Sequence, residues 1–186
     1  SNRTKTCTIA KYNLSNATIA NITTVTYNGS AHTPTPGVTV PIPSGSSTAL
    51  TAGTHFTYSY SNNTNAWTAT ITITAKDGTN YQWSTSKNFT INRKPVDEPS
   101  CTSATYNGSS QTLLAAKTSG GYTNQAIVGT NAWSYSKTLT LNSNYQWSAG
   151  SNVTSNRTKT CTIAQYNLSN ATVSAENQTY NGSAKT

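Results

Sequence analysis

Residues 1–10 of this chain (SNRTKTCTIA) return letter for letter as residues 155–164. The similarity continues past both copies, with KYNLSNATIA after the first and QYNLSNATVS after the second. Such a recurrence within one chain is typical of repeat arrays. We therefore predict a tandem array of folded modules that continues beyond both ends of the sequence.

Two related modules fill one period of the repeat. Three short motifs occur in the same order in each: Tyr-Asn-Gly-Ser at 27–30 and 106–109, Thr-Asn-Ala-Trp at 64–67 and 130–133, and Asn-Tyr-Gln-Trp-Ser at 80–84 and 144–148. The motifs predict a type A module over residues 12–94 and a type B module over residues 95–164. Residues 1–11 are then expected to be the last strand of a preceding module, and residues 165–186 the first strands of the next type A module.

Threonine alternates with apolar residues over residues 67–75. One face of an extended strand would carry Trp67, Ala69, Ile71, Ile73 and Ala75, and the other face only threonine. The second module repeats the pattern, with inward positions at Trp133, Tyr135, Leu139 and Leu141. Alternation with a period of two predicts strands with one buried and one solvent-facing side. Several such strands, separated by Gly, Pro and Asn turns, predict an all-β chain built of small β-sandwich modules.

The repeat also explains the three cysteines. Cys101 lies on the expected opening strand of the type B module, and Cys161 on its closing strand. The type A module has Ile22 and Phe89 at these positions, so a cysteine pair replaces an apolar pair. First and last strands commonly lie side by side in such sandwiches, and we predict a Cys101–Cys161 disulfide. Cys7 is the copy of Cys161 in the preceding module, and its partner is expected upstream of this sequence.

The charge of the chain is basic but dispersed. Twelve Lys and Arg residues stand against four Asp and Glu residues, which gives a formal net charge of +8. The basic residues are spread along the chain, and no cluster of arginine with aromatic residues occurs, which argues against a nucleic-acid surface. A weak attraction to anionic glycans or wall polymers fits this charge better. No stretch is apolar enough to predict a membrane span.

No residue set has the spacing of a catalytic or metal site. His32 and His55 have no acid or cysteine near them in the sequence, and the adjacent Asp97 and Glu98 would point in opposite directions from an extended chain. The cysteines are spaced too widely for a zinc site. We therefore predict no enzyme activity, no cofactor and no metal.

Aromatic rings are the remaining candidates for ligand contact. Trp83 and Trp147 occupy equivalent places in the Asn-Tyr-Gln-Trp-Ser motif, and we mark both as candidates for stacking against a sugar ring.

Three stretches of the chain resemble the tandem Ig-like repeats of bacterial surface proteins, in particular the MBG/YDG-like modules of giant secreted adhesins. They are ATIANITTVTYNGSAHTPTPGVTV, LTAGTHFTYSYSNNTNAWTATITITAKDGTNY and SKNFTI. The resemblance implies Ig-like all-β modules on a cell surface and provides no catalytic residues. The chain departs from it at Trp67 and Trp133, where such repeats usually read Asn-Ala-Gly.

The repeat, the strand pattern and the resemblance together predict non-catalytic structural modules of an extracellular fibre, stalk or filament. Its partners would be neighbouring repeats of the same chain and other copies in a filament. The predicted disulfide requires an oxidising compartment, which indicates secretion to the cell surface. The alternative is a module that binds glycans or wall polymers through exposed Tyr and Trp rings.

Overall fold

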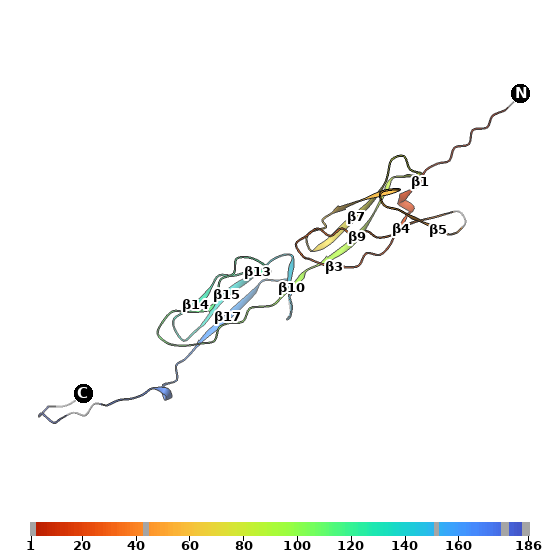
Figure 1. Ribbon diagram of the computed structural model, residues 1–186. Coiled ribbons are helices and arrows are strands. Elements are labelled where there is room, and N and C mark those ends of the chain that lie inside the picture. The colour runs from red at the N-terminus through yellow and green to blue at the C-terminus, as the bar shows by residue number, and fades with distance from the viewer. Residues whose placement is uncertain (1–2, 43–44, 151–152, 176–178, 184–186) are drawn as a thin grey trace. The chain divides into compact units, whose positions relative to one another are not determined.

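The computed structural model describes residues 3–42, 45–150, 153–175 and 179–183 (Figure 1). Its regular structure is all-β, and no α-helix occurs in the described part of the chain. The strands are β1 (Tyr12–Asn13), β2 (Thr18–Ile19), β3 (Val25–Thr26), β4 (Val38–Pro41), β5 (Ser47–Leu50), β6 (Phe56–Ser61), β7 (Trp67–Ala75), β8 (Tyr81–Gln82), β9 (Ser84–Asn92), β10 (Lys94–Val96), β11 (Ala104–Thr105), β12 (Gln111–Leu114), β13 (Tyr122–Thr123), β14 (Ile127–Gly129), β15 (Ser134–Leu141), β16 (Tyr145–Trp147) and β17 (Arg157–Ala164). Two short 3-10 turns are η1 (Leu14–Asn16) and η2 (Leu168–Asn170).

Packing divides the chain into two compact units. The first takes in residues 1–98, 118–123 and 140–157, and the second takes in residues 99–117, 124–139 and 158–186. The module boundary expected between residues 94 and 95 stays a prediction.

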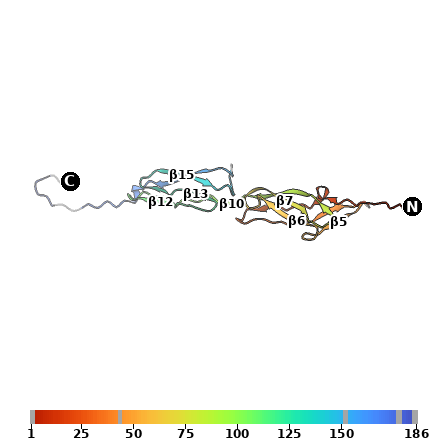
Figure 2. The same cartoon turned by 90° about the horizontal axis from the view of Figure 1, so that it is seen from above.

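The first unit has two main sheets with strand orders β3-β9-β7-β6 and β2-β4-β5. In the larger sheet β7 runs antiparallel to both β6 and β9, and β6 and β7 lie side by side in Figure 2. Strand β3 joins the sheet parallel to β9, with Val25 opposite Ile91. One core cluster draws residues from both sheets, so the sheets pack against each other: Leu14, Ile19, Val38, Val40, Leu50, Phe56 and Ile73.

The alternation predicted for residues 67–75 is confirmed at its centre. Ala69, Ile71 and Ile73 are buried on one side of β7. The threonines point to the other side, where Thr70 donates to the Asn88 side chain of β9 at 3.0 Å. The inward position of Trp67 is wrong, because 72% of this residue is exposed. Trp67 is the first residue of β7, and its backbone φ of +144° departs from that of a regular strand.

The second unit contains the β12–β14 pair and the parallel β11–β17 pair, with Ala104 opposite Ile163. The sheet that contains β11 and β17 has the strand order β11-β17-β15-β13. The core of the unit joins β12 and β14 to β17 through Leu113, Ile127, Cys161 and Ile163. Both repeats therefore place an early strand parallel to a late one.

The inward face predicted for residues 133–141 is confirmed in part. Leu139 is fully buried, while Tyr135 and Leu141 are half-buried. The Tyr135 ring covers Gly129 of β14 so closely that a Cβ on this glycine would clash with the ring. The inward position of Trp133 is wrong, since this residue is 71% exposed and precedes β15.

Each copy of Tyr-Asn-Gly-Ser forms the same turn. The side-chain oxygens of Asn28, Asn107 and Asn181 accept a hydrogen bond from the backbone N–H two residues on, at 2.9, 3.0 and 3.3 Å. The glycine that follows each asparagine has φ between +78° and +86°, a conformation that glycine adopts without steric cost. The motif therefore forms the local turn expected from its sequence. The glycine of each copy has the positive φ, and the asparagine does not.

The terminal segments differ from the interior copies of the same sequence. Residues 3–11 form no strand and are exposed, although residues 157–164 form β17. After β17 the described residues 165–175 and 179–183 contain η2 and no strand. Leu14 of η1 is fully buried, whereas its copy Leu168 in η2 is exposed. The expected roles of residues 1–11 and 165–186 in neighbouring modules stay predictions, and residues 1–2, 176–178 and 184–186 lie outside the described part.

Candidate functional site

The predicted cysteine bridge is confirmed. Cys101 and Cys161 form a disulfide with their Cα atoms 5.7 Å apart. Cys161 lies on β17 as expected, whereas Cys101 precedes β11 and is not part of a strand. In the other repeat, Phe89 is buried and Ile22 packs against its cluster. An apolar contact in one repeat is thus replaced by a covalent bond in the other, as the repeat phase predicts. Cys7 is exposed and unbridged.

The two equivalent tryptophans of the Asn-Tyr-Gln-Trp-Ser motif have opposite environments. Trp83 is 69% exposed, and its φ of +69° places it at a break between β8 and β9. Trp147 is only 1% exposed and lies in β16. A ring without solvent access cannot stack on a ligand, so the proposed ligand role of Trp147 is wrong. Trp83 keeps the exposure that such a role requires.

Trp147 forms the centre of a small packed cluster in the first unit. Its indole N–H donates to the Ser155 carbonyl at 2.8 Å, and the Tyr122 ring packs against it at 5.3 Å. The Arg157 guanidinium lies 5.2 Å from the centre of the indole ring and pairs with Glu98 at 3.0 Å. These contacts come from segments distant in sequence, which is why a local motif gives no sign of the burial.

Both histidines make local structural contacts. The His55 Nδ1 atom accepts from the Thr51 backbone N–H at 2.8 Å, which is a local turn contact. The backbone N–H of His32 donates to the Asn63 carbonyl at 2.8 Å, and the Asn63 side chain donates to the His32 carbonyl at 2.9 Å. In the described residues no group of three or more His, Cys, Asp or Glu residues is placed to hold a metal ion.

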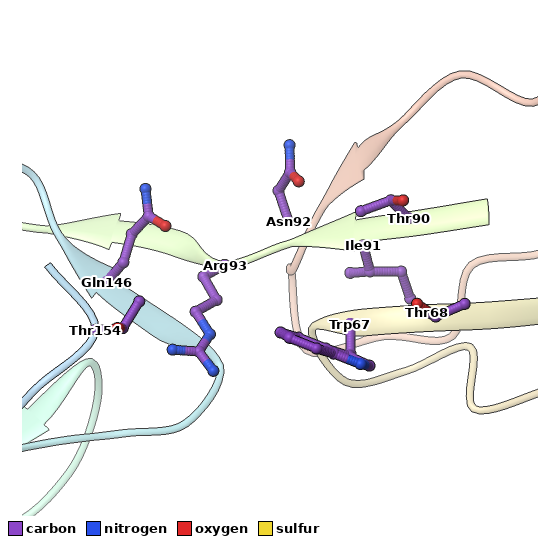
Figure 3. Close-up of a pocket in the computed structure, with 8 residues that line it drawn as sticks. All are labelled: Trp67, Thr68, Thr90, Ile91, Asn92, Arg93, Gln146 and Thr154. Carbon is purple, nitrogen blue, oxygen red and sulfur yellow. The ribbon is translucent and has the colours of Figure 1, made fainter.

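A hollow lies beside the exposed Trp67, at the start of β7 and the end of β9 (Figure 3). It has a volume of about 520 Å³ and is lined by Trp67, Thr68, Thr90, Ile91, Asn92, Arg93, Gln146 and Thr154. Arg93 directly follows β9, and Figure 3 shows its side chain pointing to the side on which the Trp67 indole lies. The sequence pattern missed this site because it placed Trp67 in the core. The departure from Asn-Ala-Gly is a sequence signal at this position, but the same departure occurs at Trp133.

Trp67 has a backbone φ of +144°, a value that L side chains rarely adopt. Strained backbone of this kind costs on the order of 1–3 kcal/mol, and the exposed indole regains little of this by burial. We expect Trp67→Gly to raise the free energy of unfolding by about 1 kcal/mol, after subtraction of the chain entropy that glycine adds to the unfolded state. Urea unfolding followed by circular dichroism measures the change.

The matched control is Trp133→Gly. Trp133 is equally exposed, but its φ is not positive, so the glycine there relieves no strain and is expected to lower stability slightly. An increase of equal size in both variants would contradict strain at Trp67.

Three phenol groups are partly withdrawn from water. Burial raises the pKa of Tyr58, Tyr60 and Tyr122 above the ordinary value of 10.0, and the nearby Tyr60 raises that of Tyr58 further. The protonated hydroxyls of Tyr58 and Tyr60 donate to the carbonyls of Pro36 and Pro34, at 2.5 and 2.8 Å. Folding therefore favours the neutral phenol at these positions.

The pH dependence of stability follows from these shifts. The unfolded chain ionises its tyrosines near pH 10, while the folded state holds the protons to higher pH. The stabilisation is complete below this pH and is lost as the pH rises through the folded pKa values. With only four acids in the chain, we expect a nearly constant melting temperature from about pH 5 to 9 and a decline above about pH 10. Calorimetry across this range checks it; a Tyr58→Phe, Tyr60→Phe double variant should show a shallower alkaline decline.

Comparison of the chain with protein-family models, with curated proteins and with solved structures found no match. Across the described residues, no helix has the length and apolar character needed to cross a bilayer.

Proposed function

We propose that this chain consists of structural repeats of an extracellular fibre, stalk or filament, and that its role is to bear mechanical load and not to catalyse a reaction. The observation that carries the proposal is the strand pairing common to both repeats. Val25 of β3 lies opposite Ile91 of β9, and Ala104 of β11 lies opposite Ile163 of β17, both in parallel register. Parallel pairing of an early and a late strand puts this ladder in shear when a repeat is pulled from its two ends.

The disulfide adds a covalent path for force. Cys101 precedes the first strand of the pair and Cys161 lies in the second, with 60 residues of sequence separation between them. A force that enters near residue 101 and leaves near residue 161 is transmitted through the sulfur atoms. The strands between them then carry none of it. A disulfide forms and persists in an oxidising compartment, and this supports the proposed location at the cell surface.

Contacts within the first unit support a stiff connection between the predicted modules. The Asn144 side chain accepts from the Ala66 backbone N–H at 2.8 Å and donates to the Asn65 side chain at 3.0 Å. Tyr27 and Tyr145 pack edge to face with ring centres 5.6 Å apart. Residues on both sides of the predicted boundary therefore belong to one packed body, which suits tandem Ig-like modules in a fibre.

Single-molecule force spectroscopy tests this proposal. Pulling the chain from its ends under oxidising conditions should unfold the type A repeat, while the segment closed by the disulfide does not extend. Reduction should release this segment and add about 210 Å of contour length, from about 60 residues of extended chain. Extension of the type A repeat without a distinct unfolding peak would show that the parallel strand pair does not resist force. This result would contradict a mechanical role.

Electron microscopy of the protein as its native host produces it tests the proposed tandem arrangement. Negative stain should show beaded threads, whereas compact particles would contradict a tandem array.

The exposed indoles favour a second candidate function. Trp67, Trp83 and Trp133 are each about 70% exposed, and exposed aromatic rings suit contact with glycans or wall polymers. An array of surface polysaccharides tests this alternative. Loss of glycan binding in the Trp83→Ala variant would support it for Trp83, a stacking candidate named from the sequence.

A further inference from the structure

The hollow beside Trp67 combines an aromatic surface with a positive charge. Trp67 at the start of β7 provides an exposed indole, and Arg93 follows β9 and faces the same side (Figure 3). Thr154 adds a hydroxyl group to the lining. All three residues belong to the first unit. The hollow is therefore a feature of one packed body.

The charge of Arg93 is not neutralised within the described residues. Arg93 is half-buried, and no hydrogen bond or ion pair to its side chain is found there. The chain has only four acids, and one of them, Glu98, pairs with Arg157. A guanidinium group in this setting can accept a carboxylate or sulfate from a ligand in two-pronged geometry.

The strain at Trp67 is an independent argument for binding. An exposed tryptophan held at φ +144° weakens the fold and gains almost no burial in return. Backbone strain of this kind concentrates at ligand sites, where it holds a side chain in the geometry that the ligand needs. The type B repeat lacks both features, because Trp133 has no positive φ and Gln165 stands where the type A repeat has Arg93.

We propose that this hollow binds an acidic sugar of the uronate class. The apolar face of the pyranose ring stacks on the Trp67 indole, and its carboxylate pairs with the Arg93 guanidinium. The volume of about 520 Å³ lies within the range typical of small-ligand sites. The proposal goes beyond the mechanical role and does not depend on it, since a fibre repeat can bear load with or without a sugar site.

A nucleic acid is the less suitable occupant. Single strands need a continuous row of cations along their backbone together with several stacking rings. The hollow has one ring and one guanidinium among its lining residues, which suits a single charged sugar.

Isothermal titration calorimetry on the whole chain, with linear trigalacturonate as the probe, tests the proposal. The neutral probe is the corresponding galactotriose, which has the same rings without carboxylates. Arg93→Gln should weaken trigalacturonate binding about 10-fold or more, the effect of losing a charge-assisted hydrogen bond, and leave galactotriose binding unchanged. Trp67→Gly should weaken both probes about 10-fold while it raises the melting temperature. Weaker binding in a more stable protein separates a ligand role from a structural one.

Two matched variants control for general effects. Lys94→Gln removes the charge next to Arg93 from an exposed residue outside the hollow, and Trp133→Gly removes an equally exposed indole in the other repeat. Both should leave binding within about 2-fold of the unaltered chain. The proposal is overturned if trigalacturonate shows no saturable binding, or if Lys94→Gln loses as much affinity as Arg93→Gln. Tighter binding of an octathymidylate single strand, lost in the same two variants, would also overturn it in favour of nucleic acid.

Discussion

Replacement of both Cys101 and Cys161 by serine is expected to lower the free energy of unfolding by about 4 kcal/mol. The bridge closes a loop with a sequence separation of 60 residues, and chain entropy alone gives a loss of this size when such a loop is opened. Cys161 is also 2% exposed in the core of the second unit, so a serine there leaves a hydroxyl among apolar side chains. Urea unfolding of the variant and of the unaltered chain under oxidising conditions measures the difference.

Cys7→Ser is the matched control, because Cys7 is exposed and unbridged. Its unfolding free energy should equal that of the unaltered chain. Alkylation without reductant, followed by mass spectrometry, should label Cys7 alone. Labelling of Cys101 in the folded chain, or an unchanged stability in the double variant, would show that the bridge does not hold this unit together.

Trp147→Ala is expected to destabilise the protein by about 3 to 5 kcal/mol, as is typical for removal of a buried large aromatic side chain. The substitution opens a cavity beside Tyr122 and leaves the Ser155 carbonyl without the indole donor. It also removes the ring over which the Arg157 guanidinium lies. Urea unfolding followed by circular dichroism measures the loss. The blue-shifted part of the tryptophan emission should disappear with this indole, since the other three tryptophans are exposed.

Trp83→Ala is the control for this variant. It changes the same residue of the same motif, but Trp83 is 69% exposed. We expect a change within about 0.5 kcal/mol, the usual range for surface substitutions. Equal losses in the two variants would mean that the motif acts through its local conformation and not through the cluster around Trp147.

Much of the fold can be predicted from local pattern. The buried Ala69, Ile71 and Ile73 follow from alternation, because successive residues of a strand point to opposite faces. The disulfide follows from comparison of the two repeats, because the early and late strands that pair in one repeat are expected to pair in the other. Ile22 and Phe89 belong to one cluster in the first repeat, and Cys101 and Cys161 are bonded in the second.

The candidate site was not predicted from the same patterns. Alternation assigned Trp67 to the core, but periodicity carries no information about which positions of a strand the rest of the fold covers. The hollow also needs Arg93 and Thr154, which reach it from segments that follow β9 and precede β17. Only the folded chain brings such residues together.

The sequence alone establishes an all-β chain with repeated turns, an alternating strand at residues 67–75 and a cysteine pair in one repeat. These features depend on local periodicity and on internal comparison, which need no knowledge of distant contacts. The tertiary structure decides the roles of the tryptophans. Asn-Tyr-Gln-Trp-Ser occurs twice with identical letters, yet Trp147 is enclosed by Tyr122 and Arg157 while Trp83 faces solvent. Burial depends on what remote segments bring to a side chain, and identical local sequences can receive different neighbours.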